Sequence, residues 1–171
     1  IYIFDMTNNF YSIIIPVKNQ QNTIHSNLLR LVNKLKHLKK MKMLKNWEII
    51  LVDDCSTDGT IFRIKKFKIK NKNIKLIINN KNRGKGFSIK KGIKFLSKQS
   101  KKIITIDADM PYFDIFNKFL LKLNKNDVVI IDRKNANSKL INKNKNFYIY
   151  YRIFIGHFLN LIFRVFRLTS L

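Results

Sequence analysis

The sequence has few of the residues on which several classes of protein depend. A single cysteine, Cys55, excludes an internal disulfide and a cysteine-rich zinc site. Five glycines and two prolines in 171 residues exclude collagen-like and low-complexity chains. No Gly-x-x-x-x-Gly-Lys-Ser/Thr run is present, which argues against a P-loop nucleotidase. Hydrophobic residues nevertheless make up 46% of the chain, which is enough for the core of one domain.

Acidic residues are scarce as well. Ten Asp and Glu stand against 35 Lys and Arg, which gives a net charge of +25. A charge of this size is typical of proteins that bind nucleic acid or an anionic membrane. Lysine and asparagine are, however, spread through every polar stretch, as in residues 142–146, which favours a compositional bias over a shaped binding face. We therefore expect no nucleic-acid partner, and a basic nucleic-acid-binding protein stays the alternative from another class.

Half of the scarce carboxylates lie in two short places. Asp53, Asp54 and Asp58 follow the apolar run 48–52, and Asp107 and Asp109 follow the run 102–106. Short apolar runs rich in β-branched residues are typical of buried parallel strands. In open α/β sheets, ligands bind outside the carboxyl ends of the strands. These aspartates are therefore candidates for holding a metal ion or the polar groups of a nucleotide.

The remaining sequence alternates between strand and helix patterns. Expected strands cover residues 11–17, 48–52, 73–78, 102–107 and 127–131, and expected helices cover about 22–45, 58–70, 84–96 and 113–123. This alternation predicts βαβ units and an α/β fold, a Rossmann-like, mainly parallel sheet flanked by helices. We expect one domain over residues 1–171, and a fragment of a longer protein that is truncated at both ends.

Four blocks in order, residues 12–19, 52–60, 82–86 and 107–109, resemble glycosyltransferase family 2. This family consists of inverting nucleotide-sugar enzymes with a GT-A fold, and the resemblance extends from about residue 11 to the end of the chain. Cys55 stands where the family usually has glycine. Residues 18–20, Lys-Asn-Gln, replace the common Tyr-Asn-Glu, so a degenerate domain without catalytic activity stays a further alternative.

The resemblance implies a role for each matching residue. Asp109 is implied as the catalytic metal ligand, with Asp107 beside it, and the cation as Mg²⁺ or Mn²⁺, which prefer carboxylate oxygens. The implied nucleotide-sugar-binding residues are Pro16, Lys18, Gln20, Val52, Asp54, Lys85, Asp107, Ala108 and Asp109. A purely structural interpretation, in which the acids cap helices and satisfy loops, explains Asp58 well and the pair at 107 and 109 poorly.

The acceptor is inferred from basic residues further along the chain. Arg133 and Arg152 match basic positions of enzymes that glycosylate dolichyl phosphate, and Arg133 would act at the reacting phosphate. An acceptor phosphate is already anionic, so it needs cations rather than a general base. The block 82–86 followed by Gly92 most resembles dolichyl-phosphate β-glucosyltransferase, which uses UDP-glucose. A mannosyl enzyme using GDP-mannose is the alternative. Such enzymes act on the cytosolic face of the endoplasmic reticulum membrane.

The C-terminal stretch 147–168 has an amphipathic pattern. Polar residues recur every three or four positions, at Arg152, Gly156, Asn160, Arg164 and Arg167. On a helix they form a narrow stripe, with aromatic and aliphatic residues over the remaining surface. Such a C-terminal amphipathic helix suits the surface of an anionic bilayer. A core helix whose stripe faces water is the alternative.

Overall fold

The computed structural model describes residues 9–111, 113–126 and 129. The strands of this part are β1 (Phe10–Val17), β2 (Asn46–Asp53), β3 (Ile74–Ile78) and β4 (Lys102–Thr105). The helices are α1 (Ile24–Lys40), α2 (Thr60–Ile69), α3 (Lys85–Ile93), the 3-10 helix η2 (Phe113–Ile115) and α4 (Phe116–Lys125).

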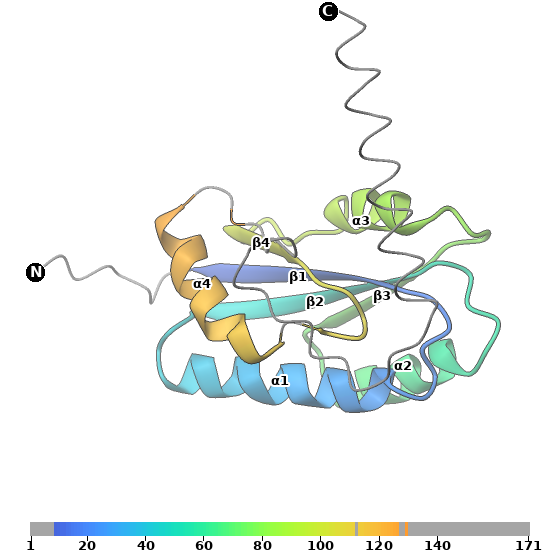
Figure 1. Ribbon diagram of the computed structural model, residues 1–171, viewed down its shortest axis with the longest axis horizontal. Helices are drawn as coiled ribbons and strands as arrows, with labels where there is room; N and C mark the ends of the chain where they lie inside the picture. Colours follow the sequence, from blue (N-terminus) through green and yellow to red (C-terminus); the bar gives the residue numbers. More distant parts are fainter. Residues whose placement is uncertain (1–8, 112, 127–128, 130–171) are drawn as a thin grey trace, which may run out of the picture. The chain divides into compact units, whose positions relative to one another are not determined.

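The four strands form one parallel sheet in the order β3-β2-β1-β4. Crossovers between parallel strands are almost always right-handed. The chain moves outward from β1 to β3 through α1 and α2, and then returns past β1 through α3. Because the direction reverses, α1 and α2 cover one face of the sheet and α3 covers the other (Figure 1). The predicted α/β fold with a parallel sheet flanked by helices is confirmed.

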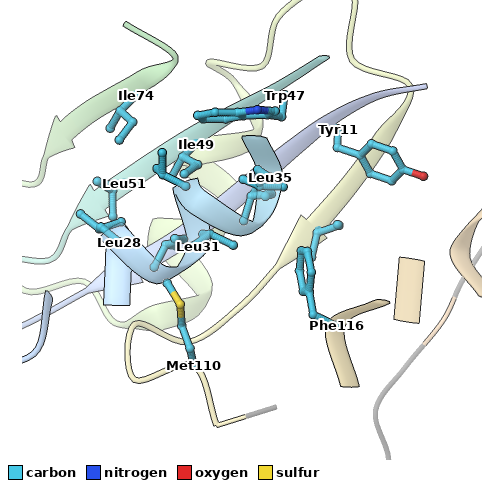
Figure 2. Close-up of a cluster of buried hydrophobic side chains, with 14 of the residues drawn as sticks. Tyr11, Leu28, Leu31, Leu35, Trp47, Ile49, Leu51, Ile74, Met110 and Phe116 are labelled. Carbon is cyan, nitrogen blue, oxygen red and sulfur yellow. The ribbon is translucent and has the colours of Figure 1, made fainter. Parts of the chain in front are cut away.

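Helices on both faces explain why β1 and β2 are apolar without alternation. Their central residues, Ile13–Ile15 and Ile49–Val52, are fully buried. Figure 2 shows the larger core cluster, in which Leu28, Leu31 and Leu35 of α1 pack against the strands. Phe116 of α4 belongs to the same cluster, so α4 contributes to the core on the α1 side.

The end of α1 differs from the prediction, which placed it near Lys45. The helix stops at Lys40 because Lys42 adopts the left-handed conformation, with φ +55°. The amide of Met43 then donates to the carbonyl of Leu38 at 2.9 Å, and the amide of Lys42 donates to the carbonyl of Lys39 at 3.0 Å. This is a Schellman motif, which usually uses glycine at the left-handed position. With lysine there, the sequence gives no stop signal.

Other predicted boundaries shift by a few residues, and two predictions fall outside the described part. The helix predicted to reach residue 96 ends at Ile93, and the strand predicted to reach residue 107 ends at Thr105. The expected fifth strand over 127–131 and the expected helix over 147–168 lie outside the described residues. In residues 9–111 and 113–126, none of the helices combines the length and the apolar character that a bilayer span requires.

Candidate active site

The carboxyl ends of four parallel strands meet at one edge of the sheet, and the predicted site residues follow these ends. Lys18 follows β1, Asp54 follows β2, Asn79 follows β3, and Asp107 lies two residues beyond β4. The strand order reverses between β1 and β4, because β2 lies on one side of β1 and β4 on the other. Open α/β sheets bind ligands at such a switch point.

Asp54 organises the loop that leads into α3. The residue is only 5% exposed, and its carboxylate accepts three hydrogen bonds. Oδ1 accepts from the Asn79 side-chain amide and from the Arg83 backbone amide, both at 2.9 Å, and Oδ2 accepts from the Gly84 amide at 2.7 Å. Burial raises the pKa of Asp54, but these hydrogen bonds and the charge of Lys18 outweigh it and leave the pKa lowered.

This position gives Asp54 a role that the sequence did not predict. Its carboxylate holds protein amides, so it fixes the backbone of residues 83 and 84 beside the site. Contact of Asp54 with a base or ribose stays a prediction. Asn79, which the sequence analysis missed, is 3% exposed and shares its side-chain amide between Asp54 and Ser88. Its position directly after β3 could have identified it, because residues that follow parallel strands lie at the edge of the sheet where ligands bind.

Lys85 connects the two acidic motifs. Gly84 has φ +84°, a conformation that L side chains rarely adopt, and it precedes the first residue of α3, Lys85. The Lys85 ammonium nitrogen lies 2.5 Å from Oδ1 of Asp107. Consecutive residues therefore reach Asp54 on one side and Asp107 on the other, which brings both motifs to the same part of the sheet edge. The structure thus brings Asp54, Lys85 and Asp107 together, and their roles in binding a nucleotide sugar stay predictions.

The Asp107-Ala108-Asp109 segment is a turn that is held in place by hydrogen bonds to its backbone carbonyls. The Met110 amide donates to the carbonyl of Asp107 at 3.0 Å, and the Asn27 side chain donates to the carbonyl of Ala108 at 2.8 Å. Met110 has φ +49° and places its side chain in the core (Figure 2). Ala108 is buried, Asp109 is exposed, and the Asp107 side chain is 31% exposed. The turn thus leaves two carboxylates accessible to solvent.

The carboxylate oxygens of these two residues are the type of ligand that a hard divalent cation prefers. Mg²⁺ takes one or two protein carboxylates and completes its shell with water and substrate phosphates. Within residues 9–111 and 113–126, no three His, Cys, Asp or Glu side chains gather as ligands for a cation. Asp107 and Asp109 are two carboxylates that could hold such a cation together with the oxygens of a bound substrate, and their role as metal ligands stays a prediction.

The loop after β1 is held against the loop after β2. The Asn19 amide donates to the Ser56 hydroxyl at 2.9 Å, and the Asn19 side-chain oxygen accepts from the Thr57 amide at 2.9 Å. The Gln20 amide donates to the Thr60 hydroxyl at 2.7 Å. The loop carrying the predicted residues at 18 and 20 is therefore positioned by the loop after β2 and by the first residue of α2.

Asp58 has the structural role that the sequence analysis allowed. Its Oδ1 accepts from the Thr60 amide at 3.0 Å and from the Thr60 hydroxyl at 2.5 Å, and its Oδ2 accepts from the Gln21 amide at 3.1 Å. Burial raises the pKa of Asp58, but these hydrogen bonds outweigh it and lower the pKa on balance. Asp58 lies two residues before the start of α2 and connects Thr60, the first residue of that helix, to the loop at Gln21.

The remaining predicted residues differ in exposure. Lys18 is exposed and Gln20 is half-buried, with its side-chain oxygen accepting from the Thr23 hydroxyl at 2.8 Å. Pro16 pairs with Val52 in the sheet, and Val52 is fully buried on the α3 side. The predicted acceptor residues Arg133 and Arg152 lie outside the described residues.

A pocket of about 330 Å³ lies beside the loop that Asp54 holds. It is lined by Asn79, Asn80, Lys81, Arg83, Phe87 and Lys91. The Arg83 guanidinium lies 5.1 Å from the centre of the Phe87 ring, and the Lys91 ammonium donates to the side-chain oxygen of Asn79 at 2.9 Å. This basic pocket was not predicted from the sequence, because its lysines are not distinctive in so lysine-rich a chain.

Sequence comparison decides the family. Residues 12–167 match the family described as Glycosyl transferase family 2. The chain belongs to this family. The predicted resemblance and the assignment to the glycosyltransferases are confirmed.

Two curated relatives of this family 2 chain are dolichyl-phosphate beta-glucosyltransferases. The one from Dictyostelium discoideum is 33% identical over 130 residues, which cover 72% of the chain and 39% of the relative. The one from Saccharomyces cerevisiae is 37% identical over 105 residues, which cover 58% of the chain and 30% of the relative. The chain thus matches between 30% and 39% of the length of these two relatives.

Two solved structures that bind nucleotide sugars share the fold. Staphylococcus aureus TarS 1–349 in complex with UDP-GlcNAc has a TM-score of 0.51 and 26% identity, with 78% of this chain and 37% of TarS covered. The mannosyltransferase PcManGT from Pyrobaculum calidifontis, in complex with GDP-Man and Mn²⁺, has a TM-score of 0.51 and 21% identity, with 61% and 29% covered. The GT-A fold of this family 2 chain is confirmed.

Proposed function

We propose that this chain is the donor-binding part of a glycosyltransferase that transfers glucose from UDP-glucose to dolichyl phosphate with inversion, giving dolichyl β-D-glucosyl phosphate. The names of the two curated relatives support glucose as the transferred sugar and dolichyl phosphate as the acceptor. The family supports the transfer of a sugar.

The observation that carries the proposal is the pair Asp107 and Asp109 just beyond β4, accessible to solvent and joined through Lys85 to the loop that Asp54 holds. Mg²⁺ or Mn²⁺ bound there would neutralise charge that develops on the departing diphosphate. The Mn²⁺ in the mannosyltransferase with the same fold supports a divalent cation. Lys85, at the start of α3, supplies a positive charge and backbone amides that favour phosphate.

The acceptor part of the proposal concerns residues further along the chain. Arg133 and Arg152 would place the dolichyl phosphate next to the donor, and the stretch 147–168 would lie on the membrane surface. The proposed location is the endoplasmic reticulum membrane, with the site facing the cytosol. The relatives' dolichyl-linked substrate supports a membrane setting.

A thermal-shift screen of the full chain tests the donor. UDP-glucose, GDP-mannose and UDP-GlcNAc are compared with and without Mn²⁺. We expect stabilisation by UDP-glucose that requires Mn²⁺ and that is lost in Asp109→Asn. The matched control is Asp114→Asn, which changes an aspartate that is also exposed but pairs with Arg30. Preference for GDP-mannose would favour the mannosyl alternative, and indifference to every nucleotide would favour a degenerate domain.

A further inference from the structure

We propose that Lys85 is an internal counter-cation for Asp107, and that it makes binding of the divalent cation depend on the nucleotide. In the chain without ligands the ammonium of Lys85 forms an ion pair with the Asp107 carboxylate, which would otherwise be available to the metal. When a diphosphate binds, its oxygens replace Asp107 as the partner of the ammonium, and the Asp107 carboxylate is released. This inference rests on the proposed function, since it assumes that Asp107 ligates the metal.

The charged groups of this ion pair are accessible to solvent, whereas the backbone that carries Lys85 is fixed. The Lys85 nitrogen and Asp107 Oδ1 are 2.5 Å apart, with the side chains 59% and 31% exposed, so both partners can be reached from solvent. The backbone before Lys85 is fixed, because the buried carboxylate of Asp54 accepts from the Gly84 amide at 2.7 Å. The Gly84 carbonyl accepts from the Ser88 amide at 3.2 Å, which continues this restraint into α3. Only the flexible stem of Lys85 has to move.

Electrostatics makes the two cations compete. An ammonium and a divalent cation on the same carboxylate repel each other, and this repulsion is reduced but not removed by water at a half-exposed site. A diphosphate brings enough negative charge to hold both cations at once. Cation and nucleotide therefore each raise the affinity of the site for the other, and this coupling is equal in both directions.

The test uses the full chain with Lys85→Gln, which removes the charge and keeps most of the length of the side chain. Free Mn²⁺ is measured by electron paramagnetic resonance without nucleotide, and UDP binding is measured by calorimetry at saturating Mn²⁺. Without nucleotide we expect the variant to bind Mn²⁺ about three to ten times more tightly. With Mn²⁺ present we expect it to bind UDP roughly ten times more weakly, because a charge-assisted contact with phosphate is lost.

Three further variants assign the effect to the ion pair. Lys90→Gln removes the same charge from an exposed position of α3 and should change neither affinity. Lys85→Arg keeps the cation and should keep most of the coupling. The double variant Lys85→Gln with Asp107→Asn should lose the gain in Mn²⁺ affinity. Circular dichroism of each variant checks that the fold is retained.

Opposite changes in the two affinities are the signature of exchange. If Lys85→Gln leaves Mn²⁺ affinity unchanged or lowers it, Lys85 does not compete with the metal and the inference is wrong. If Lys90→Gln has the same effect as Lys85→Gln, the cause is general charge and the inference is wrong as well. If no variant and no wild-type sample binds UDP, the proposed function fails, whereas a gain in Mn²⁺ affinity confined to Lys85→Gln would still support the competition.

Discussion

Asp54→Asn is expected to destabilise the fold although it changes only one atom of the side chain. In the native protein the carboxylate accepts from Arg83, Gly84 and Asn79 at 2.7 to 2.9 Å. Asparagine keeps one acceptor oxygen, which can serve the two donors now on Oδ1. Its amide group then faces the Gly84 amide, so two donors oppose each other in a site that is 5% exposed.

The expected magnitude follows from this single mismatch. A hydrogen bond to a charged acceptor is worth about 1.5–3 kcal/mol, and a buried donor without a partner costs about 1–3 kcal/mol. Burying a neutral amide instead of a carboxylate recovers part of this cost. We expect the free energy of unfolding to fall by about 2 kcal/mol, which is a large share of the 5–15 kcal/mol that is typical of a domain.

Urea unfolding measures this change, and the protein contains its own probe. Trp47 is the only tryptophan in the sequence and is 4% exposed, so its fluorescence should report unfolding. Asp114→Asn is the matched control: the Asp114 side chain is 91% exposed and its partner Arg30 is 52% exposed, so the effect of this change should lie within the error of the measurement. Equal unfolding midpoints for Asp54→Asn and Asp114→Asn would refute the assignment of Asp54 as the residue that holds the loop.

Three other changes test separate parts of the fold by the same unfolding assay. Cys55→Gly should raise the free energy of unfolding by about 1 kcal/mol, since Cys55 has φ +59°, and a lower stability would show that its thiol contacts matter more than its backbone strain. Gly92→Ala should cost about 2 kcal/mol, because an added Cβ would lie 2.7 Å from Cγ2 of Ile14, and an unchanged midpoint would mean that α3 can shift away. Burial raises the pKa of Glu48, but the hydrogen bonds it accepts and its pair with Lys75 lower the pKa on balance. The ionised Glu48 carboxylate therefore stabilises the fold fully above the pKa that Glu48 has in the unfolded chain, and this stabilisation is lost as the pH falls through its lower pKa in the folded protein. The free energy of unfolding should decrease below about pH 4.5, and it should decrease less in Glu48→Gln.

Much of the fold was predictable because the strands are buried on both faces. The runs at Ile13–Ile15 and Ile49–Val52 have no polar interruption, and this identified the central strands. Boundaries were less predictable where the backbone takes a conformation that the residue type does not reveal. Lys42 ends α1 in a left-handed conformation, and nothing in a run of lysines distinguishes that position.

The candidate site was predictable where scarcity made residues conspicuous. In a chain with ten acids, Asp107 and Asp54 directly after apolar runs were a clear signal. Their partners were less visible, because Asn79 is a common residue type here and Arg83 contacts Asp54 through its backbone amide, which the residue type does not reveal. Sequence spacing does not reveal that Gly84 and its neighbour bridge the two acidic motifs; that depends on the path of the chain into α3.

The strand order has a consequence for how the protein forms during synthesis. β4 pairs with β1, so Lys102 lies opposite Tyr11, although most of the described sequence separates these two residues. Contacts between such distant segments form slowly, since a long loop must close before they contribute. The first three strands neighbour one another in chain order, so a nascent chain can assemble them early. The acidic turn after β4 reaches its place only afterwards, so the proposed cation binding would report on late folding.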